Sequence, residues 1–203
     1  MFTKSSFSPA WWLKNEQVNP TCSRPIVAVL HGLEGSKNSH YAKGMLSAIK
    51  AQGWVGVLMH FRGCSGRPNR MAKSYHSGQT CDVDFFSQYL ASNYPQAKKA
   101  IIGFSLGGNV LTRYLAEQKE NIYQAACVIC APLDLSSCSN RINRGFSRVY
   151  QKYLVDMLRA STIKKINANL LSNIDRNHLN KVRSIRDFDQ MVTAPINGFL
   201  DAN

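Results

Sequence analysis

The chain has 203 residues, enough for one domain-sized core, and its hydrophobic fraction of 44% is ordinary for a globular protein. It contains 25 Lys and Arg against 12 Asp and Glu, a formal net charge of +13. No apolar run approaches the roughly 20 residues that span a bilayer, and the first residues lack the apolar segment and cleavage site of a signal peptide. We therefore expect a cytoplasmic protein without a membrane span.

The cysteines give no sign of a disulfide framework or a metal centre. There are six of them, scattered along the chain, and no exported context favours disulfides. Cys127 and Cys130 form a C-x-x-C inside an apolar strand pattern, but residues three apart on a strand point to opposite faces. No second Cys or His pair has the spacing of a zinc site. We expect buried structural thiols and no metal.

Apolar runs alternate with helical patterns over the first two thirds of the chain. The predicted strands cover residues 26–30, 54–59, 100–103 and 125–130, and the predicted helices cover residues 38–51, 82–92 and 107–118. Strands separated by helices favour a parallel sheet with helices on both faces. The sequence therefore predicts an α/β fold.

The pattern changes after Pro132. Amphipathic helices are predicted near residues 144–160, 162–171 and 178–183, and no convincing strand returns. This arrangement is typical of a helical cap placed over the ends of the strands. We expect three regions: a partial N-terminal segment at 1–23, a core at 24–133 and a helical cap-like region at 134–203.

A G-x-S-x-G motif, Gly103-Phe104-Ser105-Leu106-Gly107, joins a predicted strand directly to a predicted helix. This setting is the one that the nucleophile elbow of an α/β-hydrolase requires. The serine sits on a strained turn, and the positive end of the helix dipole lies near the developing negative charge. We predict Ser105 as a nucleophile for acyl chemistry. The alternative is a glycine-rich turn that only packs the helix against the strand.

The segment HGLEG at residues 31–35 follows the first predicted strand. In an α/β-hydrolase the loop at this position donates one N–H to the oxyanion, and the residue after the nucleophile donates the other. We therefore expect the backbone N–H groups of Leu33 and Leu106 to form the oxyanion hole. A phosphate loop is the competing interpretation, but neither the G-x-x-x-x-G-K-[ST] nor the G-x-G-x-x-G spacing is present.

Four further residues are expected near the ligand crevice. His60 and Arg62 leave the end of the second predicted strand, which borders the crevice in a parallel sheet. His31 begins the oxyanion segment, and His76 lies in a later loop. Each is a candidate pocket residue. The alternative, a hydrogen-bonded structural role, is slightly favoured for His60 and Arg62.

The sequence resembles the YheT-like family of α/β-hydrolases, bacterial relatives of the eukaryotic abhydrolase proteins. The resemblance runs from about residue 24 to residue 202 and rests on the segments HGLEGS (31–36), GVLMHFRGCSG (56–66), PNRM (68–71), YHSG (75–78), GFSLGGN (103–109) and GFSRVYQKYL (145–154). It implies an esterase of the carboxylic-ester hydrolase class that acts on a small-molecule ester. It also implies a Ser-Asp-His relay without a metal or organic cofactor.

The chain departs from this family where the relay is concerned. The acid and then the histidine follow the serine in the α/β-hydrolase order, on strands beyond the cap. The only later histidine is His178, in a cap-like stretch, and Asp134 has no histidine to orient. We expect truncation at both ends, with the relay Asp and His and the C-terminal strands absent. We also expect impaired activity on esters, an exposed edge at residues 125–130, and a complementing fragment as a candidate partner.

Two other classes of function stay open. A non-catalytic remnant would bind a ligand or a protein partner through the cap. A basic chain can also bind nucleic acid or an anionic membrane surface, and much of the positive charge lies after residue 140. No nucleic-acid-binding motif is present, so we expect no specific nucleic acid.

Overall fold

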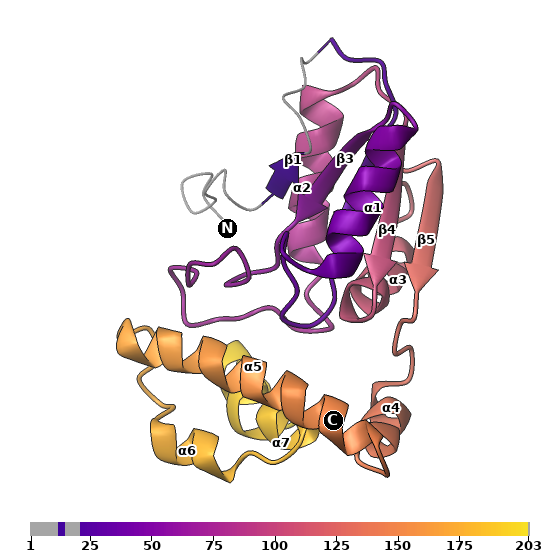
Figure 1. The fold of residues 1–203 in the computed structure, drawn as a ribbon. Helices are drawn as coiled ribbons and strands as arrows, with labels where there is room; N and C mark the ends of the chain where they lie inside the picture. Colours follow the sequence, from indigo (N-terminus) through magenta and orange to yellow (C-terminus); the bar gives the residue numbers. More distant parts are fainter. Residues whose placement is uncertain (1–11, 15–20, 203) are drawn as a thin grey trace. The chain divides into compact units, whose positions relative to one another are not determined.

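The computed structural model describes residues 12–14 and residues 21–202. For residues 12–14 only the backbone is described. The structure divides the chain into two compact units (Figure 1). The first, which we call the sheet unit, comprises Met1–Ser65 and Ser77–Pro132. The second, which we call the helical unit, comprises Gly66–His76 and Leu133–Asn203.

The sheet unit is built on a five-stranded sheet with the order β1-β3-β2-β4-β5. The strands are β1 (Trp12–Lys14), β2 (Ile26–Leu30), β3 (Val55–Met59), β4 (Lys99–Phe104) and β5 (Ala125–Ile129). Strands β2 to β5 are mutually parallel, and β1 pairs with β3 in the antiparallel sense. The predicted α/β fold is confirmed. The sequence patterns missed β1, because three residues are too few to show a period.

Three helices connect the parallel strands: α1 (His40–Ala51), α2 (Cys81–Asn93) and α3 (Leu106–Glu117). Figure 1 shows α1 on one face of the sheet and α2 and α3 on the other. Right-handed crossovers require this distribution, because β2 to β3 runs one way across the sheet while β3 to β4 to β5 runs back. Because β2 to β5 are parallel, their carboxyl ends lie at the same edge of the sheet, and the loops that follow these strands meet there.

The central strands are buried along their whole length. Every residue of β2 and of β3 is buried, because helices cover both faces of the sheet there. On the α1 face, Val27 and Val29 pack with Leu58 against Ala42, Leu46 and Ile49. This packing explains why both strands are continuous apolar runs in the sequence, without an alternation of polar and apolar residues.

Strand β5 is the edge of the sheet, and its side chains are largely exposed. Cys127 and Cys130 are both exposed, so the prediction of buried thiols is wrong for this pair. Of the cysteines at positions that the structure describes, Cys64 is buried. The apolar pattern of residues 125–130 correctly indicated a strand. Burial, however, depends on neighbouring strands and helices, which a local pattern does not report.

The helical unit contains no strand within its described residues. Its elements are α4 (Leu135–Ile142), α5 (Ser147–Asn167), α6 (Arg176–Lys181), α7 (Ile185–Phe188), the π-helix η3 (Asp189–Thr193) and α8 (Ala194–Asn197). No helix in the described part of the chain has the length and apolarity needed to cross a membrane.

Helix α5 differs from the sequence prediction, which divided it near residue 161. It runs unbroken for 21 residues. Thr162 is accommodated because its Oγ1 donates a hydrogen bond to the carbonyl of Leu158 at 2.8 Å, and no glycine or proline interrupts the segment. Helix α4 was missed because its sequence is rich in serine. It begins where Asp134 accepts a hydrogen bond from the N–H of Ser137.

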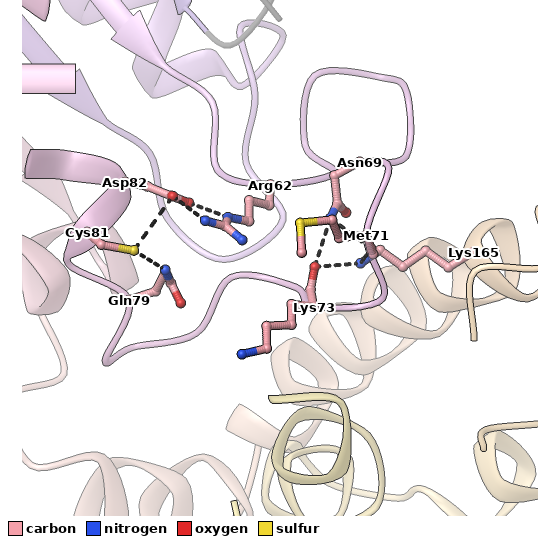
Figure 2. A network of polar contacts seen from close by, with 8 residues as sticks. All are labelled: Arg62, Asn69, Met71, Lys73, Gln79, Cys81, Asp82 and Lys165. Carbon is pink, nitrogen blue, oxygen red and sulfur yellow. Dashed lines mark hydrogen bonds and ion pairs between the residues drawn. The ribbon is translucent and has the colours of Figure 1, made fainter. Parts of the chain in front are cut away.

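Lys165 of α5 is hydrogen-bonded to the loop Gly66–His76 of the helical unit. Its ammonium is buried and donates to the Ser74 hydroxyl at 2.7 Å, to the carbonyls of Ala72 and Lys73 at 3.0 and 3.1 Å, and to that of Met71 at 3.4 Å. Figure 2 shows Lys165 beside Met71 and Lys73. Oxygen acceptors gathered around one cation compensate for its burial.

Candidate active site

Ser105 occupies the turn between β4 and α3 with φ 51° and ψ −120°, in the positive-φ region that non-glycine residues rarely adopt. Its N–H donates to the carbonyl of Ile129 at 2.8 Å. Its own carbonyl accepts from the N–H groups of Gly108 and Asn109 at 2.9 and 3.1 Å. The neighbouring strand and the first turn of α3 thus hold the strained serine, whose side chain is half-buried. This is the geometry predicted from the G-x-S-x-G motif.

The glycines of the motif allow three backbone segments to approach closely. A Cβ on Gly103 would lie 2.6 Å from the carbonyl oxygen of Gly107, and a Cβ on Gly107 would lie 2.7 Å from that of Leu30. Both distances are too short for real side chains. The start of α3 is therefore packed directly on the ends of β4 and β2, which brings the loop after β2 next to Ser105.

Gly32, in that loop, lies directly against Ser105. A Cβ on Gly32 would be 3.0 Å from Cβ of Ser105 and 3.6 Å from its Oγ. The N–H of Gly35 donates to the Gly32 carbonyl at 3.0 Å and closes a turn around Leu33. Leu106 begins α3, where the first N–H groups have no partner in the helix. Neither the Leu33 nor the Leu106 N–H is hydrogen-bonded to any described residue. Both remain available as donors.

His31 braces the oxyanion loop and is fully buried. Its Nε2 accepts from the N–H of Phe61 at 3.1 Å, so the proton resides on Nδ1, which donates to the Gly32 carbonyl at 2.7 Å. Burial, together with the charge of the neighbouring His60, outweighs this hydrogen bond and lowers the pKa of His31 to about 4. The ring is therefore neutral near pH 7, and both of its nitrogens are hydrogen-bonded to backbone groups.

Tyr41 is a second support of the loop, and the sequence analysis missed it. The N–H of Gly32 donates to its hydroxyl at 2.9 Å, and its ring lies 4.8 Å from that of Phe104. The tyrosine sits in the first turn of α1, nine residues after the glycine. No motif spacing marks it; the contact becomes visible only once α1 is placed beside the loop.

His60 and Arg62 are buried and committed to structural contacts in the sheet unit. His60 Nε2 accepts from the N–H of Lys37 at 3.1 Å. Arg62 makes two hydrogen bonds to Asp82 of α2, from Nε at 2.7 Å and from Nη2 at 2.6 Å (Figure 2). Burial alone would lower the pKa of Arg62, but the hydrogen bonds and charge of Asp82 raise it. These contacts agree with the structural alternative for both residues.

The remaining polar candidates belong to the helical unit and have partners there. The ring of His76 meets that of Phe199 edge-on, with 5.2 Å between their centres. His178 lies 2.9 Å from an oxygen of Asp175, with which it forms a capping box at the start of α6. Asp134 accepts from the hydroxyl and the N–H of Ser137, and these bonds lower its pKa. None of these contacts involves Ser105.

Within the described residues, no group of three or more His, Cys, Asp or Glu side chains is placed to hold a metal ion. The arrangement around Ser105 offers instead a hydroxyl on a strained turn beside two unused amide donors. Such an arrangement suits attack on a carbonyl carbon, with stabilisation of the resulting oxyanion.

Comparison with known proteins places this geometry in a family. The family described as "alpha/beta hydrolase fold" matches residues 25–175. "Putative esterase YheT" of Escherichia coli (strain K12) is 46% identical over 183 residues, which make up 88% of this chain and 53% of that protein. "Monoacylglycerol lipase" of Saccharomyces cerevisiae is 28% identical over 196 residues, covering 92% of this chain and 43% of that protein. The resemblance to YheT-like proteins is confirmed.

Among solved structures, "Esterase (EaEST) from Exiguobacterium antarcticum" superposes with a TM-score of 0.51 at 18% identity, over 77% of this chain and 53% of that one. At this identity the likeness concerns the fold alone. The chain spans about half the length of the curated relatives it matches. With the parallel sheet and the matched residues taken together, the chain belongs to the α/β-hydrolase fold family.

Proposed function

We propose that this chain supplies the nucleophile and the oxyanion donors of a serine hydrolase that acts on carboxylic esters. The observation that carries the proposal is the contact of Gly32 with Ser105, which sets the free N–H of Leu33 and the free N–H of Leu106 on the two segments flanking Oγ. As Oγ attacks the ester carbonyl, negative charge develops on the carbonyl oxygen. These two amides are the donors that would stabilise it.

The proton of Ser105 needs a base. Within the described residues of the sheet unit, no histidine or carboxylate is hydrogen-bonded to Oγ of Ser105, and His31 and His60 each accept from a backbone N–H. We propose that the relay Asp and His are not supplied by the residues of this chain. The chain alone should then be strongly impaired, because loss of the histidine alone costs on the order of a millionfold in kcat in a serine protease.

The names of the relatives support a proposal for the substrate class. Proteins similar to this chain are named "Putative esterase YheT", "Monoacylglycerol lipase" and "Phospholipase ABHD3". Each name denotes cleavage of an ester of some kind. We propose a small-molecule carboxylic ester as the substrate, with neither a metal nor an organic cofactor taking part.

The test is ester hydrolysis with a base supplied from solution. Turnover of p-nitrophenyl butyrate is measured with increasing imidazole, for the full chain and for Ser105→Ala. We expect weak turnover that imidazole accelerates in the full chain beyond its effect on Ser105→Ala, since the oxyanion hole and binding retain on the order of a thousandfold over water. Identical imidazole-dependent rates for the two proteins would contradict the proposal.

A further inference from the structure

Helix α5 carries a second apolar face that points to solvent. Leu154, Val155 and Leu158 are buried and form its inner face. On the outer side, large apolar side chains recur at the spacing i, i+3, i+4, i+7, which places them on one helical stripe. We call them the outer stripe: Phe146, Val149, Tyr150 and Tyr153, with exposed fractions of 97%, 72%, 56% and 58%.

A hollow lies next to the outer stripe, between α4 and the start of α5. Its volume is about 420 Å³. It is lined by Ser137, Cys138, Arg141, Ile142, Ser147 and Tyr150. Tyr150 belongs to both features, and its ring is stacked on that of Tyr153 with 6.4 Å between their centres. The stripe and the hollow therefore form one continuous apolar surface on α4 and α5, larger than the single exposed residues that are normal on a monomer.

The charged side chains near this surface are mostly basic. Arg141 lines the hollow and Arg144 lies in the turn between α4 and α5, whereas Arg148 and Lys152 are exposed on other sides of α5. Residues 135–155 contain no Asp or Glu, and Asp134, which precedes them, is hydrogen-bonded to Ser137. The nearest acid along the helix, Asp156, is paired with Lys152 at 2.6 Å and lies 3.8 Å from Arg159. Arg141 donates to the hydroxyl of Ser147 at 3.0 Å. The partner that complements this surface is therefore anionic as well as apolar.

Those two properties distinguish among the candidate partners. A second copy of the chain would bring another basic surface, and a net charge of +13, against the first. Nucleic acid complements the charge, but it offers no apolar phase for Phe146 and Val149. An anionic bilayer offers both phosphate headgroups and an acyl boundary.

We propose that the α4–α5 surface docks on an anionic phospholipid membrane, with Phe146 and Val149 entering the acyl boundary and with Arg141 and Arg144 facing the headgroups. Tyr150 and Tyr153 are aromatic side chains with a polar tip, which suits the interface between the two phases. The inference goes beyond the proposed ester chemistry and does not depend on Ser105. Ser105→Ala should bind vesicles as the unaltered chain does, so the two proposals fail separately.

The experiment is vesicle co-sedimentation of the full chain. Vesicles of phosphatidylcholine alone are compared with vesicles that also contain phosphatidylglycerol, at low and at high salt. We expect strong binding only with the anionic lipid, and weakening as salt screens the headgroups. Phe146→Ser with Val149→Ser should reduce binding about tenfold or more, because two apolar side chains no longer enter the bilayer. Phe146→Ser alone, at a fully exposed position, should give a smaller loss in the same direction.

A matched pair of charge variants separates a local surface from bulk charge. Arg141→Glu with Arg144→Glu should reduce vesicle binding about tenfold. Lys43→Glu with Lys50→Glu, two exposed lysines on α1, changes the net charge by the same amount and should leave binding within about twofold. Circular dichroism and thermal melting establish that each variant is folded.

Several outcomes would overturn the proposal. One is the absence of binding to anionic vesicles, and another is an equal loss in the α1 control pair. A third is a dimer of the full chain that Phe146→Ser with Val149→Ser converts to monomer, because a second copy would then cover the surface. A fourth is salt-sensitive binding to duplex DNA that these apolar variants weaken as much as they weaken vesicle binding.

Discussion

Gly32 and Ser105 touch across the end of the sheet: a Cβ on the glycine would lie 3.0 Å from Cβ of the serine. Gly32→Ala should therefore push the oxyanion loop away from Oγ and misplace the Leu33 amide. We expect Ser105-dependent ester turnover in imidazole to fall about a hundredfold, the typical effect of losing one oxyanion donor. Rate measurements on the variant test this.

Gly44→Ala is the matched control for that substitution. Gly44 lies in α1, and a Cβ there would meet no atom within 4 Å. Turnover should be unchanged, and stability should rise by up to about 1 kcal/mol because alanine favours the helix. Equal turnover in both alanine variants would show that the close approach of Gly32 has no bearing on the site.

Ser105 stores backbone strain at φ 51°. Ser105→Gly and Ser105→Ala both remove the hydroxyl, but only glycine adopts this conformation without a steric penalty. The glycine variant should be more stable than the alanine variant by about 1 kcal/mol, or roughly 2–4 °C in melting temperature for a chain of this size. A lower melting temperature for Ser105→Gly would show that the turn is not strained.

The buried His31 makes the stability of the fold depend on pH. Its pKa is lowered from 6.5 to about 4, so the unfolded chain binds a proton between these values while the folded chain does not. Stability is therefore fully present above pH 6.5, falls as the pH drops, and has lost on the order of 3 kcal/mol by pH 4. Urea unfolding at several pH values measures this slope.

The control is His31→Gln, which keeps polar atoms at this position but has no titrating ring. We expect a less stable protein whose unfolding free energy changes less between pH 6.5 and pH 4 than that of the unaltered chain. The same steep slope in both proteins would assign the pH dependence to other groups.

The ion pair of Arg62 and Asp82 is buried, with side-chain exposures of 5% and 1%. Asp82→Asn leaves an uncompensated guanidinium and should cost about 3 kcal/mol, whereas the double change Arg62→Met with Asp82→Leu should recover much of that loss. Glu117→Gln breaks an equally short but exposed pair with Arg113 and should destabilise the fold much less than Asp82→Asn, because solvent screens the exposed charges. The melting temperatures of the three variants measure these differences in stability. A double variant as unstable as Asp82→Asn would contradict this account.

Lys165 holds the loop Gly66–His76 through three carbonyls and a hydroxyl. Lys165→Met should release the loop, so that trypsin cleaves after Arg70 and Lys73 roughly tenfold faster. The adjacent Lys164 is exposed, and Lys164→Met should leave cleavage unchanged. Similar cleavage of both variants would mean that the ammonium does not restrain the loop.

Much of the sheet unit was predictable because its signals are local. The strands after Pro25 and Gly53 are continuous apolar runs, and the motif around Ser105 fixes a turn that glycine alone permits on both sides. The parts that escaped prediction depend on distant neighbours. Tyr41 supports Gly32 only because α1 lies beside the loop, and Asp82 meets Arg62 from a different helix.

The errors have the same origin. Cys127 lies on an apolar strand but is exposed, because no strand beyond β5 pairs with it among the described residues. The division of α5 near residue 161 was wrong because the helix continues through Thr162, whose hydroxyl bonds back to the preceding turn. Local patterns report propensity, whereas burial and helix length are decided by packing.

The central claim, that Ser105 is the nucleophile of this site, is tested most directly by labelling with a fluorophosphonate probe in the presence of imidazole, followed by peptide mapping. We predict modification at Ser105, no labelling of that peptide in Ser105→Ala, and slower labelling in Gly32→Ala. Labelling spread over other serines, or no labelling of Ser105 at any imidazole concentration, would contradict the account.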